Sequence, residues 1–521
     1  MVAAAGTDGG HAPRAGDLRR RARLRVQVLG LARAGVRGAA AGRTAADGRP
    51  ALRHAAGRGD RFGLRPGDPD HAGGRGGGRP VVGAPRARSR VGAAPRARGS
   101  KETEMVRGHA IAAIDLGSTK IATIVGDASE GGMLRILGAG VVPSAGIEKG
   151  QISSIGQATE AINLSIEKAE RASGTRILSA GVSISGAHLS SLNNRGIVAV
   201  PDVGRPISPD DAQRVIDAAR NVSLKSNREL MHALPRYFVV DGQDRVSDPV
   251  AMHGQRLDVE MHIVTGGVNA LQNVMKCVEG ADVQVEALIA GPVAMSSAVL
   301  DPDEQQEGVV ALDIGGGTTD IAVHVDGAIV HTASLPIGGT HVTRDLVAGL
   351  RCPFMVADQA KTRYGAALSD QIAGDEAVTL SAFGQEERRE ISRRLIVEIV
   401  EARVEEILSM ALGEVKRAGH IEAISAGLVI GGGTAELEGI TTLAERRTGL
   451  PARIGQVPEV YGLADQVSGP AYATSLGVLR WMTEAFMEPI GQPLRLRMPA
   501  GGSVLGLFRG VGRLGRVFLP Q

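Results

Sequence analysis

Cysteine is scarce in this chain, and long apolar runs are missing. Two cysteines occur among 521 residues, and the spacing from Cys277 to Cys352 matches no metal-binding motif. So few cysteines argue against a disulfide-stabilised secreted domain and indicate a reducing compartment. No run of about 18 apolar residues and no secretory signal is evident. The sequence therefore predicts no membrane-spanning segment.

Lysine and apolar periodicity are both lacking in residues 1–104. This segment holds 21 arginines, one lysine and eight acidic residues, which gives a net charge of +14. Without periodic apolar residues it cannot bury a core. Three explanations are open: a basic nucleic-acid-binding arm, a transit peptide, or upstream DNA translated from a start codon placed too early. We expect a disordered segment or a mis-assigned start, with Met105 opening the folded chain.

The rest of the chain has the opposite charge. Residues 105–521 carry a net charge of −11, so the basic character of the whole sequence belongs to the first segment alone. An acidic body argues against nucleic acid as its partner. Its length is more than one domain requires.

A glycine-rich stretch at 309–323 is the most informative part of the body. An apolar strand ends at Asp313, three glycines and two threonines follow, and Asp320 leads into a second apolar strand. Backbone N–H groups in such a turn can converge on phosphate, and Asp313 is placed to hold a hydrated Mg²⁺ ion. The alternative is a glycine-rich hairpin with a surface acid. The predicted phosphate-binding residues are Gly315, Gly316, Gly317, Thr318 and Thr319.

Residues 110–125 repeat this pattern about 200 residues earlier. A strand again ends in an acid, Asp115, and a turn leads into a returning strand. Two such turns suggest two related half-folds that face one ligand, with Asp115 as a second acid near the metal; two unrelated hairpins are the alternative. Lys120 could contact phosphate or cap the turn. The predicted nucleotide-binding residues here are Asp115, Gly117, Ser118, Thr119 and Lys120.

A third glycine turn lies at 428–435, again after an apolar strand. Gly431, Gly432 and Gly433 would let a flat ring or a sugar approach the backbone closely. A plain strand-to-helix turn is the alternative, because three glycines alone are a weak signal.

Apolar periodicity places helices and one inserted unit between these turns. Short strands around a single helix make 188–259 a small inserted α+β subdomain, with Ser208 as the N-cap of its helix. The stripe of the longest helix favours packing against a subdomain core over a coiled coil. The helices expected between the turns include 154–173, 209–221, 268–278, 342–350, 357–364 and 389–418, and a further helix is expected after the third turn, at 468–481.

Three turns in this order resemble those of the actin/Hsp70/sugar-kinase superfamily. Within it, four segments resemble the bacterial cell-division protein family FtsA: 182–188, 228–235, 248–257 and 402–407. The resemblance implies an α/β, actin-like two-lobe ATPase fold of two RNase H-like halves. It also implies an FtsA-type inserted α+β subdomain and a C-terminal amphipathic helix.

The resemblance also divides the chain into parts. The expected parts are the basic segment 1–104, a first lobe of 105–187 and 260–308, the inserted subdomain 188–259, a second lobe of 309–340 and 426–486 with its small subdomain 341–425, a linker 487–502 and an amphipathic helix 503–519.

The function implied by the resemblance is cytoskeletal. Family membership implies ATP and Mg²⁺ between the lobes, with Lys361 on the helix that borders the nucleoside. It implies self-assembly into filaments that hold the C-terminal tail of the tubulin-like protein FtsZ, docked on 341–425, at the division septum, and contacts with other division proteins. A pilus-assembly scaffold and a sugar-kinase-like phosphotransferase are the alternatives.

One departure from related bacterial actins concerns catalysis. Actins of the MreB type carry a glutamate before the proline that opens the helix ahead of the second phosphate turn, whereas this chain reads Ala290-Gly291-Pro292. Without that acid the sequence offers no obvious base to activate water. We therefore expect ATP binding with slow hydrolysis at most, and assign no catalytic residue.

The C-terminal tail combines a proline-rich linker with a basic amphipathic segment. Placed at about 100° per residue, one face of 503–519 is apolar and the other is arginine-rich. Such a helix is suited to lie in an anionic membrane surface. The resemblance to FtsA, whose members end in such a segment, implies that this surface is the cytoplasmic face of the inner membrane. A helix packed on the body and a disordered tail are the alternatives. The residues predicted to bind the membrane are Val504, Leu507, Phe508, Arg509, Val511, Arg513, Leu514, Arg516 and Phe518.

Overall fold

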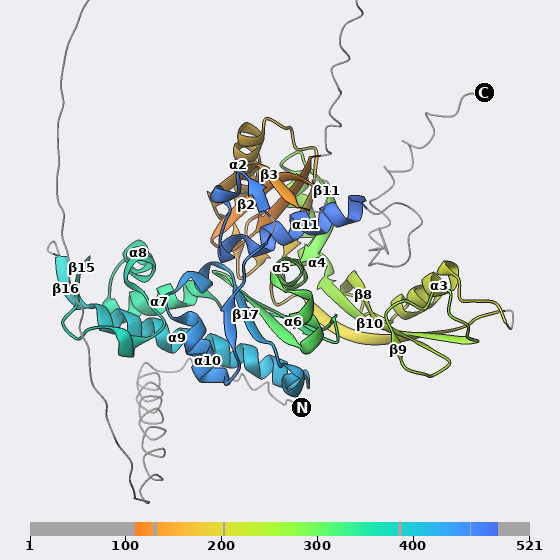
Figure 1. The fold of residues 1–521 in the computed structure, drawn as a ribbon. Coiled ribbons are helices and arrows are strands. Elements are labelled where there is room, and N and C mark those ends of the chain that lie inside the picture. The colour runs from red at the N-terminus through yellow and green to blue at the C-terminus, as the bar shows by residue number, and fades with distance from the viewer. Residues whose placement is uncertain (1–109, 129–132, 202–203, 384–387, 459, 488–521) are drawn as a thin grey trace, which may run out of the picture. The chain divides into compact units, whose positions relative to one another are not determined.

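A computed structural model describes residues 110–487 apart from 129–132, 202–203, 384–387 and 459 (Figure 1). The basic segment 1–104 and the predicted membrane helix 503–519 lie outside the described residues. Among the helices that the structure describes, none combines the length and the apolarity needed to cross a bilayer.

The first lobe is built on a six-stranded sheet with the order β11-β6-β1-β2-β3-β19. Strands β1, β2 and β3 form an antiparallel meander, and β6 and β11 continue the sheet in parallel with β1. The strands are β1 (Ile111–Leu116), β2 (Lys120–Ala128), β3 (Leu134–Pro143), β6 (Ser179–Ile184), β11 (Gln284–Ala290) and β19 (Val460–Gly462).

The second lobe repeats this plan in a five-stranded sheet with the order β14-β13-β12-β17-β18. Its first three strands again form an antiparallel meander, and the two later strands extend the sheet in parallel beside the first strand of that meander. The strands are β12 (Val309–Ile314), β13 (Thr319–Val325), β14 (Ala328–Leu335), β17 (Gly427–Gly431) and β18 (Ala452–Ile454). The shared topology confirms the prediction of two related half-folds.

Helices cover these sheets with their apolar faces. Helix α2 (Ile155–Ser173) packs on β3, and its Ala158, Ile162 and Ile166 are buried as the spacing predicts. Helix α5 (Gly291–Val299) is buried along nearly its whole length and packs against α11 (Ala473–Met487). The other elements of these lobes are β4 (Ile147–Glu148), β5 (Gln151–Ile152), α4 (Val268–Glu279) and α6 (Pro302–Glu307).

The inserted subdomain is a four-stranded sheet with one helix, as the sequence predicts. The strand order is β7-β10-β8-β9, and α3 packs on β7 and β10. The elements are β7 (Ser190–Ala199), α3 (Pro209–Arg220), β8 (Arg228–Val240), β9 (Arg245–Val246) and β10 (Arg256–Gly267).

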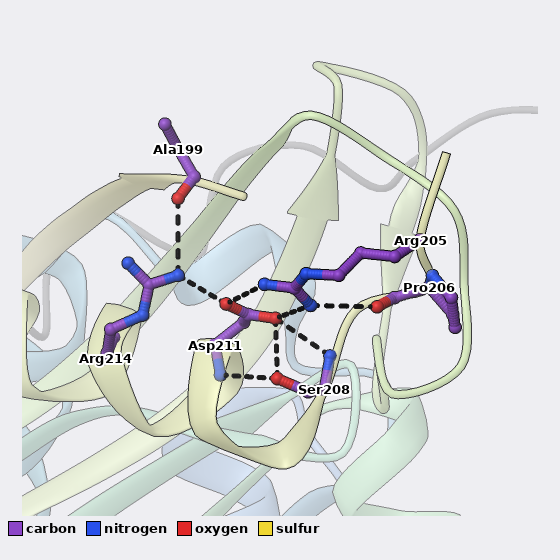
Figure 2. A network of polar contacts seen from close by, with 6 residues as sticks. All are labelled: Ala199, Arg205, Pro206, Ser208, Asp211 and Arg214. Carbon is purple, nitrogen blue, oxygen red and sulfur yellow. Dashed lines mark hydrogen bonds and ion pairs between the residues drawn. The ribbon is translucent and has the colours of Figure 1, made fainter. Parts of the chain in front are cut away.

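Helix α3 begins in a network of charged hydrogen bonds around Asp211 (Figure 2). The predicted N-cap Ser208 accepts a bond from Asp211 N at 3.3 Å, and the Asp211 carboxylate accepts from Ser208 N at 2.9 Å, which makes a capping box. Arg205 donates to both carboxylate oxygens at 2.6 and 3.1 Å, and Arg214 adds a further bond. These contacts hold the pKa of Asp211 well below its usual range, chiefly through the Arg205 bonds.

Polar side chains join the inserted subdomain to β14 of the second lobe. Ser191 Oγ donates to Thr332 O at 2.7 Å, and Asn193 Nδ2 donates to Val330 O at 3.1 Å. The buried His262 ring lies between Asn193 Oδ1 at 2.8 Å and Thr332 Oγ1 at 3.1 Å. A buried and satisfied polar contact of this kind fixes how the two units pack.

The small subdomain of the second lobe differs from the prediction at one end. The helix expected over 389–418 begins four residues later, at Arg393, because 388–392 pairs as a strand with 377–381. Ile407, Leu408, Ala411 and Val415 of the predicted apolar stripe are buried, which confirms core packing, whereas Leu395 of the same stripe is exposed. The elements over the predicted range 341–425 are α7 (Gly339–Leu350), α8 (Phe354–Tyr364), β15 (Ala377–Ser381), β16 (Arg388–Ser392) and α9 (Arg393–Arg417), and α10 (Ile440–Thr448) follows β17 in the second lobe.

The last described helix also starts later than predicted. Gly469 has φ of 98°, and Pro470–Tyr472 form a 3-10 turn, so α11 begins at Ala473 instead of 468. With this start, Thr474 in the first turn of α11 lines the cavity described below.

Candidate functional site

A cavity of about 520 Å³ is lined by all three glycine turns. This volume lies within the usual range for small-molecule sites. Of the residues predicted to bind nucleotide or metal, those that line it are Asp115, Gly117, Ser118, Thr119, Lys120, Asp313, Gly315, Gly316, Gly317, Thr318, Lys361, Gly432 and Gly433. The structure thus brings together residues that are more than 300 positions apart in the sequence.

The two predicted phosphate turns approach each other closely. A Cβ atom on Gly316 would lie 2.2 Å from Thr119 Cγ2, a distance that real side chains do not reach. The second turn is tied to the start of α7, where Gly339 N donates to Gly315 O at 2.9 Å and Thr340 N to Gly316 O at 2.8 Å. Glycine is therefore required at 316 for the turns of both lobes to face one cavity.

Two hydroxyl residues at the start of α11 bind the two aspartates. Ser475 Oγ donates to Asp115 Oδ2 at 3.0 Å, and Thr474 Oγ1 donates to Asp313 Oδ2. Ser183 Oγ donates to the other oxygen of Asp115 at 2.5 Å. One helix thus holds an acid from each lobe at the base of the cavity.

The paired aspartates suit a hydrated divalent cation. Burial raises the pKa of Asp313 to about 6; the nearby Asp115 raises it as well, while the Thr474 bond opposes the shift. A bound cation would relieve this crowding of negative charge. Among the described residues no group of three His, Cys, Asp or Glu could enclose a metal. Mg²⁺ needs fewer protein ligands than this, because it keeps most of its waters and is usually bound by one or two carboxylates.

Lys120 is a partly buried cation in the cavity wall. Burial lowers its pKa, while Asp115, Glu436 and Asp313 oppose that shift. Its Nζ lies 3.5 Å from the centroid of the Tyr472 ring, a cation–π contact. The ammonium group is therefore positioned among acids, where an anionic ligand would add to its stabilisation.

The third turn and α8 line another part of the same cavity. Gly432 has φ of 81°, and a Cβ atom there would lie 2.3 Å from Asp313 Oδ1, so this turn also needs glycine. Lys361 on α8 donates to Thr343 Oγ1 at 2.8 Å and pairs with Asp358 at 2.6 Å. These bonds orient the lysine at the cavity edge.

Two predicted site residues do not line the cavity. Thr319 is fully buried and donates from Oγ1 to Ile337 O at 2.9 Å, so it fastens β13 to the chain that follows β14. Gly431 belongs to β17, where a Cβ atom would lie 2.5 Å from Met295 Cε. Both residues act in packing behind the cavity.

Several lining residues were not identified from the sequence. Tyr472 and Thr474 lie where the sequence predicts only a helix, and nothing local connects them with the glycine turns. Glu436 follows the third turn without a distinctive pattern. Asp320 is visible as the second acid of the central turn, but its position alone suggests no role. Its pKa is raised to about 7, by burial first and then by Asp313.

Two sheets of one topology that present glycine turns to a shared cavity define an actin-like fold. Among solved structures, the PilM–PilN type IV pilus biogenesis complex is similar, with a TM-score of 0.52 and 14% identity over 73% of this chain and 99% of that chain. Identity this low shows the fold alone.

Sequence comparison identifies the family. The family model "Cell division protein FtsA" matches residues 310–477, and "SHS2 domain inserted in FTSA" matches 186–265. The cell division protein FtsA of Pseudomonas aeruginosa is 39% identical over 72% of this chain and 89% of its own. That of Escherichia coli K12 is 30% identical over 73% and 91%, and that of Bacillus subtilis 33% over 71% and 82%. The chain belongs to the FtsA family of actin-like cell-division proteins.

Proposed function

We propose that this protein is an ATP-binding cytoskeletal adaptor, which polymerises and tethers FtsZ filaments to the inner face of the cytoplasmic membrane. The observation that carries the proposal is the conjunction of FtsA membership over nearly the whole described chain with a three-turn cavity. The pilus scaffold and the sugar kinase are not proposed further, because the sequence relatives are division proteins.

The cavity supports nucleotide binding. The turns at 117–120 and 315–318 provide backbone N–H groups and hydroxyls for phosphates, and Lys120 provides a cation. Gly432 and Gly433 leave space against the backbone for the adenosine, beside Lys361. Asp115 and Asp313 would hold Mg²⁺ through its waters, and the ion would neutralise phosphate charge.

Nucleotide would act here mainly as a conformational ligand. Because the two phosphate turns come from different lobes, a nucleotide that contacts both stabilises the closed arrangement. A closed cleft would favour assembly with further copies of the chain. A filament then presents many tails at once, so weak lipid contacts add up to strong avidity.

The membrane contact is assigned to 503–519 and the FtsZ contact to 341–425. The first assignment rests on the segregation of apolar and arginine side chains in the tail. The second follows from family membership, as does placement at the division septum together with other division proteins.

Co-sedimentation with anionic liposomes tests the membrane part of this proposal. The full chain should pellet with anionic vesicles, and a chain ending at Gly502 should remain in solution. Phe508→Asp should also abolish pelleting, because it places a charge on the apolar face. The matched control Gly510→Ala should bind at least as well, because alanine favours helix by about 1 kcal/mol. Equal pelleting of the full and shortened chains would remove the anchor from the account.

A further inference from the structure

Helix α11 is anchored on the sheet of the first lobe. It packs on β1, β2 and β6, where two strand glycines allow a close approach: a Cβ atom at Gly126 would lie 2.7 Å from Leu479 Cδ2, and one at Gly181 would lie 2.6 Å from Met482 Cγ. Contacts this close leave the helix little freedom to slide or turn. The first turn of α11 is therefore a rigid support beside the cavity.

The hydroxyl group of Thr474 reaches from this helix to the second lobe. Its Oγ1 atom donates to Oδ2 of Asp313 on β12, and among the described side chains Thr474 alone hydrogen-bonds this carboxylate. The other oxygen, Oδ1, lies against the cavity residue Gly432, where a Cβ atom would be 2.3 Å away. Because the last torsion of an aspartate is broad, the carboxylate could rotate without such a bond. Thr474 thus fixes how Asp313 presents its two oxygens.

Asp115 of the first lobe is held by two hydroxyl groups. Ser475 Oγ donates to its Oδ2 at 3.0 Å, and Ser183 Oγ on β6 donates to its Oδ1 at 2.5 Å. If the Ser475 bond is lost, the Ser183 bond still orients this carboxylate. The two residues of α11 therefore differ: Ser475 shares its task, whereas Thr474 performs its task alone.

We propose that Thr474 and Ser475 are positioning residues for the divalent cation that accompanies the nucleotide, and that Thr474 is the more important of the two. This inference rests on the proposed binding of Mg·ATP in the same cavity. Each hydroxyl group acts through the carboxylate that it holds, and the carboxylate in turn accepts hydrogen bonds from the waters of the ion.

This arrangement couples the cation to the contact between the lobes. The pair of oriented acids is complete only while Asp313 of the second lobe lies against α11, which is anchored on the first. A cation that binds this pair raises the affinity for the nucleotide, and by linkage the nucleotide raises the affinity for the cation by the same factor. Removing a hydrogen-bond partner of a metal-binding carboxylate typically lowers metal affinity about 10- to 100-fold.

Calorimetry on the full chain with a non-hydrolysable ATP analogue tests this role. The dissociation constant of the analogue is measured with excess Mg²⁺ and again in EDTA. Thr474→Val removes the hydroxyl group and keeps the branched shape, so it should weaken binding about 10- to 100-fold in Mg²⁺ and leave binding in EDTA unchanged. Thr474→Ser keeps the hydroxyl group and should restore the wild-type dependence on Mg²⁺. Ser475→Ala should lose less than Thr474→Val, because Ser183 still holds Asp115.

The same helix offers a matched control. Thr483 is also a buried threonine of α11, but its Oγ1 atom donates to Leu479 O at 2.9 Å and touches neither acid. Thr483→Val should therefore bind the analogue as the wild type does under both conditions. Should Thr474→Val not fold, Thr474→Ala allows the same comparison.

The contrary results separate the claims. Binding by Thr474→Val that matches the wild type, or that weakens equally in Mg²⁺ and in EDTA, would overturn the positioning role. Wild-type protein that binds the analogue equally well in Mg²⁺ and in EDTA would overturn the role of the cation and leave nucleotide binding intact. Wild-type protein that binds the analogue under neither condition would instead contradict the proposed function on which this inference rests.

Discussion

The charged network at the start of α3 predicts that the inserted subdomain depends on Asp211. Asp211→Asn keeps the size of the side chain and removes its charge, so no cavity forms. The native carboxylate is 2% exposed and accepts bonds from Arg205, Arg214 and Ser208 (Figure 2). The substitution leaves two guanidinium groups facing a neutral amide whose NH₂ group cannot accept a bond.

The size of the effect follows from how buried each partner is. Hydrogen bonds to a charged group contribute about 1.5–3 kcal/mol each, and breaking a fully buried ion pair costs about 3–5 kcal/mol. The Arg205 and Arg214 side chains remain 32% and 48% exposed, so water can compensate them in part. We therefore expect a loss of about 2–4 kcal/mol in the local stability of the insert.

Hydrogen exchange read out by mass spectrometry measures this local loss. A change of 2–4 kcal/mol speeds exchange in β7, β8 and β10 by about 30- to 1000-fold, since each 1.4 kcal/mol is a factor of ten. The matched control is Asp210→Asn, an exposed acid one position earlier on the same helix. Exchange that is unchanged, or that rises equally in the insert and both lobes, would refute the reasoning.

Lowering the pH should remove the difference in free energy of unfolding between Asp211→Asn and the wild type. The folded-state pKa of Asp211 is depressed, whereas the unfolded value is near 3.8. The stabilisation is therefore complete above pH 3.8 and is lost as the pH falls toward the lower folded-state value. The free energies of unfolding of the two proteins should converge in that range, and a constant difference would contradict the assigned charge network.

Two further predictions concern the cavity and the joint of the insert. Gly316→Val should push the turn at 316 away from Thr119 and lower the affinity for ATP, measured by calorimetry, at least tenfold (about 1.4 kcal/mol or more). The control Gly374→Ala, where an added Cβ meets nothing within 4 Å, should bind ATP normally. Equal ATP affinities of the two variants would rule out the close approach of the turns. Burial lowers the pKa of His262 from 6.5 to about 3, so the stability that the neutral ring contributes is full above pH 6.5 and is lost as the pH falls toward 3. The melting temperature of the wild type should therefore drop more steeply over that range than that of His262→Gln. Melting temperatures that fall in parallel with pH would argue against a buried neutral ring.

The parts of the fold that local sequence determines were predictable. Each glycine turn follows an apolar strand and stands beside an acid or a hydroxyl, so its geometry is encoded within about ten residues. The helix over 155–173 and the Ser208 cap are equally local. The inserted subdomain was recognisable because its short strands interrupt the helical periodicity around it.

The parts that depend on distant partners were not predictable. Residues 388–392 pair with 377–381, and that pairing prevents the helical pattern from starting at 389. Thr474 reaches an aspartate 161 positions away, and Ser475 one that is 360 positions away. Asp320 could be seen in the sequence, but only the packing of Gly291 against Ser185 shows where its carboxylate lies.

The adaptor role itself is tested most directly by asking whether the protein brings FtsZ to a membrane. Fluorescent FtsZ is mixed with anionic liposomes, Mg·ATP and either the full chain or the chain ending at Gly502, and the pellets are compared. The account predicts that FtsZ sediments only with the full chain. FtsZ that stays in solution while the full chain pellets, or that pellets equally with the shortened chain, would contradict it.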